Sequence, residues 1–442
     1  MNQRLLDELN ELIRIPSISS GGGDLADLMR AAEWLSAKVT GAGGTAEIVT
    51  TAGNPLVVGS LDADVPDAPT VMIYGHYDVQ SADPVEDWTS PPFEPTIRDG
   101  RLYARGASDD KGNFYPLMFV ACELASEGKL PVNVRIIVEG EEEVGSQNII
   151  DFILADEQGA DCCIIFDSIM IDADTPAITL AGRGMVLIEL DVVTGTRNLH
   201  SGLYGGSAMN AVHVLNHLLD QVKPGPDGRV RPELRDGLRE PTQEELDAWS
   251  KLPPGEGVIT DEGGTPVWSG SGDEYYIQNW ADASLDIHGI AGGDAAQVRT
   301  IIPVTANAKF SIRLAPDQHA RAIADTLVEL LEAAVPEGAE VKINVHSMTD
   351  PAMFDPNSDA MNIAKDAFER ACGTRPVLTR IGGTLPILVA LAERKIPTIV
   401  SGFALAEDAI HAPNESYWLK GLELGEKTAR ELYAGLANLS HG

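Results

Sequence analysis

The sequence predicts an α/β protein in which a mainly parallel sheet is covered by helices and a smaller α+β domain is inserted. Over roughly the first 180 residues, helical patterns alternate with short β-branched runs, as in strands connected by helices. From about Gly184 the strand patterns alternate apolar and polar residues, which is typical of half-buried antiparallel strands. The 442-residue length also exceeds the size at which a single core usually divides.

The elements of the first part follow from these patterns in order. An amphipathic helix with leucines at helical spacing ends before Pro16, and further helices are predicted over 24–39 and 113–126. Between and after the helices lie apolar runs that suit strands buried on both faces. These predicted strands are 70–74 (TVMIY), 132–138 (VNVRIIV) and 162–166 (CCIIF).

The remaining elements predict the domain organisation. The inserted part has predicted strands at 185–193, 306–314 and 340–345 and predicted helices at 210–222, 242–251 and 318–334. The last part returns to α/β character, with helices at 358–372, 385–394 and 422–437 and a strand at 398–401. We therefore expect residues 1–183 and 350–442 to form the larger domain and residues 184–349 the inserted one.

Composition excludes some classes of function. The chain has 67 Asp and Glu against 32 Lys and Arg, a formal charge of −35, which argues against nucleic acid or an anionic membrane as a partner. The four cysteines form no CxxC or other framework, which fits a reducing compartment. The first helix is not a signal peptide, and no apolar run is long enough to span a bilayer. We expect a cytoplasmic protein.

Charged residues follow the predicted strands directly. His76 and Asp78 come after the first strand, Glu139–Glu143 after the second, and Asp167 after the third. Ligands of parallel sheets gather at the carboxyl ends of strands, so three strand ends would bring ligand-type residues to one edge. The sequence therefore predicts a binding site there.

Each cluster also has a plain structural interpretation. His76 could be a surface histidine, Asp109 could cap the helix that follows it, and the glutamate run could be a solvated turn. Two adjacent acids between glycines exceed what a cap needs, and three adjacent glutamates repel one another unless cations neutralise them. With His411, these residues supply two imidazoles and several carboxylates, which suit a hydrolytic pair of Zn²⁺, Mn²⁺ or Co²⁺.

Seven longer motifs make the chain recognisable. It resembles the M20 metallopeptidase family, and within it the branch of cytosolic non-specific dipeptidases and carnosinases. The motifs occur in family order along nearly the whole chain. They are GHYDVQSADPVEDWTSPPFEP (75–95), LYARGASDDKGN (102–113), VEGEEEVGS (138–146), NLHSGLYGG (198–206), SLDIHGI (284–290), KFSIRLAP (309–316) and RIGGTLP (380–386).

The resemblance implies a set of metal ligands. His76 and Asp167 would hold one divalent cation, and Glu143 and His411 would hold the other. Asp109 would bridge both. We therefore expect two metal ions per subunit, Zn²⁺ or Mn²⁺, with Co²⁺ as a further option.

Two further residues receive catalytic roles from the resemblance. The family pattern Gly-x-Glu-Glu-x-Gly-Ser selects Glu142 as the general base that takes a proton from water and passes it to the leaving amine, and leaves Glu141 as the variable position. Asp78 would orient His76. The resemblance also implies a cis peptide bond between Asp109 and Asp110.

Substrate contacts are implied mainly for the inserted domain. Arg313 would grip the carboxylate at the substrate's C-terminus, as a guanidinium can, and Thr300 would contact the same end. His200 would donate to the oxyanion in the active site of the other subunit. Backbone N–H groups at Gly383 and Thr384 could receive an anion, although the branch often has Ser at the position of Thr384. The alternatives are a loop histidine at 200 and an ion pair at 313.

The resemblance thus implies a dipeptidase that cleaves dipeptides or similar small amides with a metal-activated water. The larger domain would be catalytic, and the inserted one would be a lid and dimerisation domain with hinges near Arg183–Gly184 and Thr349–Asp350. We expect a homodimer. An N-acyl-amino-acid deacylase or a carboxypeptidase of the same fold would share the metal site. A non-catalytic protein that binds a metal or a partner would not need Glu142.

Overall fold

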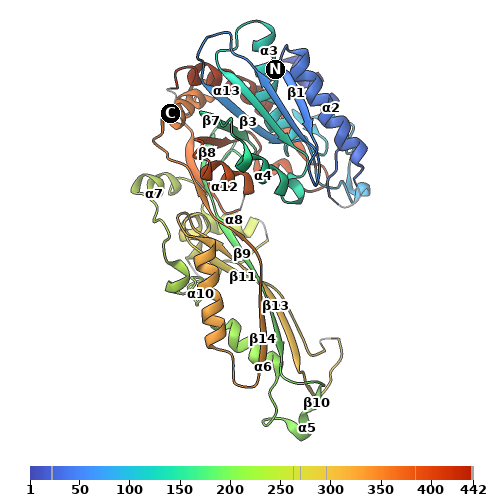
Figure 1. Cartoon of the computed structure of the whole chain (residues 1–442), viewed down its shortest axis with the longest axis vertical. Helices are drawn as coiled ribbons and strands as arrows, with labels where there is room; N and C mark the ends of the chain where they lie inside the picture. The colour runs from blue at the N-terminus through green and yellow to red at the C-terminus, as the bar shows by residue number, and fades with distance from the viewer. Residues whose placement is uncertain (21–22, 262, 269, 295, 384, 440–442) are drawn as a thin grey trace. The chain divides into compact units, whose positions relative to one another are not determined.

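The computed structural model describes residues 1–20, 23–261, 263–268, 270–294, 296–383 and 385–439 (Figure 1). These residues form two compact units, each described here by itself. The first unit comprises Met1–Leu180, Phe354–Thr379 and Pro386–Gly442, and the second comprises Ala181–Met353 and Arg380–Leu385.

The first unit is built on a sheet whose strand order is β1-β2-β6-β3-β7-β17-β8. Its central strands β6, β3, β7 and β17 are parallel, whereas β1, β2 and β8 pair antiparallel at the two sides. The strands are β1 (Thr45–Val49), β2 (Leu56–Leu61), β3 (Thr70–His76), β6 (Asn133–Glu139), β7 (Cys162–Phe166), β8 (Ala177–Gly182) and β17 (Thr398–Ser401). This arrangement confirms the predicted α/β fold with a parallel central sheet.

Helices bury the apolar faces of this sheet. Helix α2 packs against β1 and β2, α3 packs against β3, α13 packs against α3 and α11, and α4 packs against α12. The first eleven residues of α3 are all buried. The helices are α1 (Gln3–Ile13), α2 (Leu25–Gly41), α3 (Lys111–Ser126), α4 (Gln147–Ala155), α11 (Asp359–Cys372), α12 (Pro386–Glu393) and α13 (Leu419–Leu436).

Three strands in the sheet order given above, β1, β2 and β8, were not predicted from the sequence. Strand β1 is short and only half-buried, so it lacks a clear apolar pattern. Strand β2 is interrupted by Gly59, where an added Cβ would lie 3.3 Å from Val39 of α2. The glycine therefore allows the helix to approach the sheet while weakening the strand signal. Strand β8 is a short run, AITLAG, that ends in glycine.

The second unit contains an antiparallel sheet of order β11-β13-β9-β14. Buried residues alternate with more exposed ones along strand β9, as its sequence predicts, and helices α6 and α10 contribute to this unit's core. The elements are β9 (Gly184–Val193), β10 (Leu199–His200), β11 (Ser284–Gly292), β12 (Ile301–Ile302), β13 (Thr305–Leu314), β14 (Glu340–Thr349), α5 (Ser201–Tyr204), α6 (Ala211–Leu219), α7 (Gln243–Trp249), α8 (Gly255–Asp261), α9 (Tyr275–Trp280) and α10 (Ala320–Ala333).

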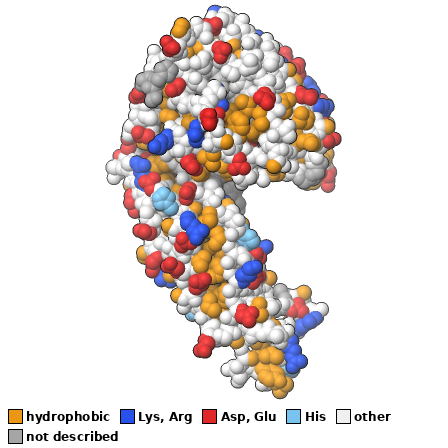
Figure 2. All heavy atoms as spheres, in the orientation of Figure 1, with side chains coloured by type: hydrophobic (Ala, Val, Ile, Leu, Met, Phe, Trp, Pro, Cys, Tyr) orange, Lys and Arg blue, Asp and Glu red, His pale blue; other side chains and the backbone are white. Residues whose placement is uncertain are grey.

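Several short strands lie outside the sheet orders given above. A three-stranded sheet joins β4 (Thr96–Arg98), β5 (Arg101–Tyr103) and β18 (Ser416–Trp418), while β15 (Ala352–Met353) and β16 (Val377–Ile381) both pair with β8. Acidic side chains are scattered over the visible face of the molecule rather than gathered in one patch (Figure 2). Among the described residues, no helix combines the length and the apolar character that crossing a bilayer requires.

Candidate metal centre

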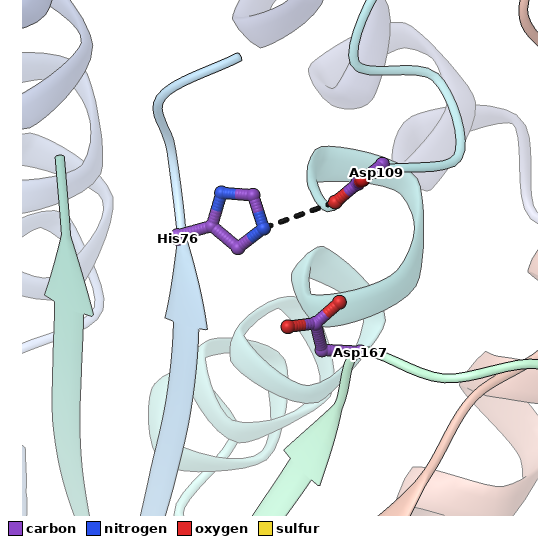
Figure 3. A group of neighbouring side chains, drawn as sticks. All are labelled: His76, Asp109 and Asp167. Carbon is purple, nitrogen blue, oxygen red and sulfur yellow. Dashed lines mark hydrogen bonds and ion pairs between the residues drawn. The ribbon is translucent and has the colours of Figure 1, made fainter. Parts of the chain in front are cut away.

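The first group of ligand-type side chains lies where parallel strands end. His76 is the last residue of β3, Asp167 directly follows β7, and Asp109 precedes α3 (Figure 3). Their ligand atoms lie within 4.8 Å of one another, and Nε2 of His76 is 3.0 Å from Oδ1 of Asp109. Strands β3 and β7 are direct neighbours, so the sheet itself sets the spacing between His76 and Asp167.

A second group shares Asp109 with the first. Nε2 of His411 lies 3.0 Å from Oδ2 of Asp109 and 3.1 Å from Oε2 of Glu143. These three residues again place their ligand atoms within 4.8 Å of one another. Because Oδ1 of Asp109 faces His76 and Oδ2 faces His411, this one carboxylate joins the two groups.

The donor set fits a pair of divalent cations. Each group offers one imidazole and two carboxylates, which is the mixture of nitrogen and oxygen ligands that suits Zn²⁺, Mn²⁺ or Co²⁺. The carboxylates of both groups stand close together. Bound cations would neutralise this negative charge.

The electrostatics follow from this crowding. Burial alone would raise the pKa of Asp109, but the hydrogen bonds from His411 and His76 outweigh burial and hold it below its usual value. Hydrogen bonds to Asp109 and Glu143 raise the pKa of His411 to about 10. Burial raises the pKa of Asp167 well above that of an exposed carboxyl. The two histidines thus supply positive charge beside Asp109 and Glu143.

Asp78 orients the first group from the far side of His76. Its Oδ1 lies 3.3 Å from Nδ1 of His76, which leaves Nε2 directed at Asp109. The two carboxylate oxygens also accept the backbone N–H groups of Glu142 and Glu143, both at 3.2 Å. One buried carboxylate therefore fixes a ring and the turn that carries Glu142 and Glu143.

Glu142 and Glu141 are used differently although they are adjacent. Glu142 belongs to neither ligand group. Its pKa is raised, mainly by burial and further by the neighbouring carboxylates of Asp109 and Glu143. Glu141 is occupied elsewhere, because its carboxylate accepts hydrogen bonds from the backbone N–H of Asn54 and from the backbone and side chain of Asn148. This division matches the register that the sequence resemblance selects.

Several supporting residues were missed by the sequence analysis. Ser19 donates to Oδ2 of Asp78 at 2.5 Å, Gln80 donates to Oε2 of Glu143 at 2.9 Å, and Glu415 binds the loop of Asp109. Gln80 could have been found, because it stands two residues after Asp78 in an extended segment. Ser19 carries no local signal, since only the fold brings it to Asp78.

The predicted substrate residues lie in the second unit. His200 pairs with Ile301 across β10 and β12, and the backbone carbonyl of Thr300 accepts from the backbone N–H and the hydroxyl of Ser201, so these two residues lie on adjoining segments. Arg313 lies on β13, opposite Ser284 of β11. Thr384 falls outside the described residues.

Arg183 supports the loop that contains Gly383. Its Nε donates to the carbonyl of Gly382 at 2.9 Å, Nη1 donates to Oγ of Ser284 at 2.9 Å, and its backbone N–H donates to the carbonyl of Gly383 at 3.1 Å. Burial, and then the neighbouring charge of Arg313, lower the pKa of Arg183 to about 10. Two guanidinium groups are therefore neighbours beside this loop.

The Asp109–Asp110 peptide bond is cis, as the resemblance implies. The N-cap position of α3 is Asp110, whose side chain makes no capping hydrogen bond. The carboxylate of Asp109 lies next to the rings of His76 and His411. The structural interpretation of Asp109 as a helix cap is therefore wrong.

Comparison with known proteins agrees with these observations. The Beta-Ala-His dipeptidase of Homo sapiens is 30% identical over 372 residues, covering 82% of this chain and 73% of that protein. The Cysteinylglycine-S-conjugate dipeptidase of Corynebacterium striatum is 27% identical over 432 residues, covering 94% of this chain and 91% of that protein.

Solved structures of peptidases also resemble this chain along nearly its whole length. An M20 family metallo-carboxypeptidase from Sulfolobus solfataricus matches with a TM-score of 0.84 and 27% identity, over 99% of this chain and 100% of that one. Human carnosine dipeptidase 1 matches with a TM-score of 0.76 and 25% identity, over 99% and 96%. Residues 72–434 match the sequence model of peptidase family M20/M25/M40. The chain belongs to this family.

Proposed function

We propose that this protein is a metal-dependent dipeptidase that hydrolyses the peptide bond of dipeptides or similar small amides. The observation that carries the proposal is the position of Asp109, whose two oxygens face His76 and His411 and so join two ligand groups. The relatives named as dipeptidases supply the substrate class.

In this proposal the ligands are divided as the two groups suggest. His76 and Asp167 would hold one cation, Glu143 and His411 would hold the other, and Asp109 would serve both groups. A pair of divalent cations supplies Lewis acidity, which polarises the scissile carbonyl and makes water easier to deprotonate. Zn²⁺, Mn²⁺ and Co²⁺ all suit these donors.

Glu142 performs the proton transfers. Its carboxylate takes a proton from the attacking water and then delivers it to the nitrogen of the leaving amine. Asp78 keeps Glu142 in place through the backbone hydrogen bond at 3.2 Å and keeps the imidazole of His76 in the orientation that a ligand needs.

The second unit contributes the substrate contacts. Arg313 binds the C-terminal carboxylate of the dipeptide, with Thr300 at the same end, and His200 donates to the oxyanion. Backbone N–H groups at Gly383 and Thr384 receive an anion. The neighbouring positive charge of Arg183 supports an anion-binding role for this region. We also propose that the protein is a homodimer in which His200 and Thr300 act on the partner's site.

We further propose a cytoplasmic location. The four cysteines, all of which lie in the described part of the chain, form no disulfide. Free thiols suit a reducing compartment.

A second candidate function is that of a carboxypeptidase. The observation that favours it is the metallo-carboxypeptidase from Sulfolobus solfataricus, which matches along both chains with a TM-score of 0.84. The same metal centre would serve either enzyme, so the length of the accepted peptide separates them.

The test uses metal-stripped protein to which Mn²⁺, Zn²⁺ or Co²⁺ is returned. The panel contains free dipeptides, the same dipeptides with an acetylated N-terminus or an amidated C-terminus, and longer peptides. We expect metal-dependent cleavage of free dipeptides, a loss on C-amidation, and a decrease in kcat of about 100-fold or more in Glu142→Gln.

Glu141→Gln is the matched control. It removes the negative charge next to Glu142, but from a side chain that accepts hydrogen bonds from Asn54 and Asn148. Because the new amide N–H₂ would face an N–H donor, this variant should lower the melting temperature, but the folded protein should keep its kcat. Cleavage of longer peptides from the C-terminus would favour the carboxypeptidase, and cleavage of N-acyl substrates alone would indicate a deacylase. Full activity in Glu142→Gln would refute the proposed base.

A further inference from the structure

Glu415 is a completely buried glutamate that connects two loops carrying candidate ligands. The first, the Asp109 loop, comprises residues 104–110. The second, the His411 loop, comprises residues 405–415. Neither loop is a helix or strand throughout, so side-chain contacts decide how the two loops lie relative to each other.

The Glu415 carboxylate accepts four hydrogen bonds, all from the Asp109 loop. Oε1 accepts the backbone N–H groups of Ser108 at 2.8 Å and Asp109 at 3.1 Å. Oε2 accepts the backbone N–H of Gly106 at 2.9 Å and Nη1 of Arg105 at 2.7 Å. Both oxygens are thus fully used, as a buried carboxylate requires.

The His411 loop needs such an anchor because its backbone is unusual. Ala409, His411 and Asn414 have φ values of 55°, 61° and 65°, in the left-handed region that L-residues rarely occupy. Residues persist in this region only where surrounding contacts hold them. Asn414 supplies one such contact, since its Oδ1 accepts the backbone N–H of Thr89 at 2.8 Å.

A second carboxylate joins the same two loops. Oδ2 of Asp408 accepts the hydroxyl of Ser108 at 2.8 Å and the backbone N–H of Leu405 at 2.9 Å. Of these two carboxylates, Glu415 is the one that binds the backbone N–H of Asp109. It stands four residues beyond His411 in the sequence.

We propose that Glu415 is a positioning residue for the metal centre: it sets the 3.0 Å approach of His411 to Asp109 by fixing the backbone of one ligand loop on the other. This inference rests on the proposed function, because it assigns Asp109 and His411 as ligands. Glu415 belongs to neither ligand group, so its effect passes through these two residues.

The test is Glu415→Gln, which keeps the size of the side chain but turns an amide N–H₂ towards N–H donors. Binding of Co²⁺ to the metal-stripped protein is measured by calorimetry, and its visible spectrum reports the coordination. We expect about 10- to 100-fold weaker binding of Co²⁺, an altered spectrum and a lower kcat at saturating metal. Glu415→Asp keeps the charge and should fall between wild type and Glu415→Gln.

Asp156→Asn is a matched control. Asp156 also binds an arginine, Arg135, at 2.7 Å and 3.0 Å and accepts the backbone N–H of Gly159 at 3.0 Å. Arg135 lies near the beginning of β6, at the opposite end of the strand from Glu139. Asp156→Asn should lower the melting temperature while leaving Co²⁺ affinity and the spectrum unchanged.

The outcomes separate the two proposals. If Glu415→Gln loses only thermal stability, as Asp156→Asn should, the positioning role is overturned. If Glu415→Gln does not fold, Glu415→Asp decides, and wild-type Co²⁺ affinity there overturns the inference. If the wild-type protein binds two Co²⁺ but cleaves no dipeptide, the proposed substrate class fails, while the comparison of Co²⁺ affinities still decides the role of Glu415.

Discussion

The carboxylate of Asp78 lies 3.3 Å from Nδ1 of His76, on the side of the ring opposite Asp109. The same carboxylate accepts the backbone N–H groups of Glu142 and Glu143. In Asp78→Asn, one oxygen becomes a donor that faces other donors. We expect about 10- to 100-fold weaker binding of Mn²⁺ or Co²⁺, measured by calorimetric titration. An unchanged affinity would show that the Asp78 carboxylate is not needed to orient His76, whose Nδ1 also lies 3.1 Å from the backbone carbonyl of Asp78.

The N-terminal segment also supports the site, through Ser19. Its hydroxyl donates to Oδ2 of Asp78 at 2.5 Å. The hydroxyl of the next residue, Ser20, makes two neutral hydrogen bonds: it donates to the amide oxygen of Gln80 at 3.1 Å and accepts the backbone N–H of Ser81 at 3.2 Å. Because hydrogen bonds to charged groups are stronger, Ser19→Ala should lower the free energy of unfolding by about 1.5–3 kcal/mol, and Ser20→Ala by a smaller amount, about 1 kcal/mol, although it loses two hydrogen bonds. Urea unfolding of both variants measures the difference, and equal losses would contradict it.

Glu139 predicts a dependence of stability on pH. Its carboxyl is buried, Oε1 accepts from Tyr74 at 2.5 Å and from Ser146 at 3.0 Å, and Oε2 has no partner among the described residues. Burial is the main cause that raises its pKa from 4.5 to about 8. Between these values the folded protein keeps a proton that the unfolded chain has lost, so this residue makes stability fall as pH rises.

Glu139→Gln removes this titration. In metal-free protein, the free energy of unfolding of the variant should rise relative to wild type between pH 5 and pH 8, by a total on the order of a few kcal/mol. Urea unfolding at several pH values checks the difference. Parallel curves for the two proteins would mean that Glu139 is ionised in the fold at neutral pH.

Metal removal should destabilise the protein, because the ligand carboxylates of both groups crowd together. A ligand that binds only the folded state at 100 times its Kd adds about 2.7 kcal/mol to the free energy of unfolding. We expect chelation to lower the melting temperature in calorimetry, and returned Mn²⁺ to restore it. In Asp109→Asn, chelation should change the melting temperature far less than in the wild-type protein. If chelation leaves the melting temperature unchanged, the assignment of both ligand groups is contradicted.

The sequence predicted those parts of the fold whose signal is local. The run CCIIF coincides with β7, and Ser358 and Asn210, which begin predicted helices, are the N-caps of α11 and α6. Strands β1 and β2 were missed because their pairing with each other and with β6 is not encoded in a local pattern.

The same distinction applies to the site. His76 and Asp167 could be predicted because they end neighbouring parallel strands. His411 is recognisable from the sequence only through the resemblance, since it lies in an irregular loop with a positive φ. Glu415 and Ser19 act through contacts 306 and 59 residues away along the chain, which no periodicity reveals.

The span of these contacts has a consequence for biosynthesis. The side chain at position 109 meets its second imidazole only when residue 411 has been made, 302 positions later in a chain of 442. A nascent chain that still lacks this histidine cannot complete the second ligand group, however long the ribosome pauses. The proposed second ligand group can therefore form only after residue 411 has been made, and a product truncated before this residue would carry an incomplete centre.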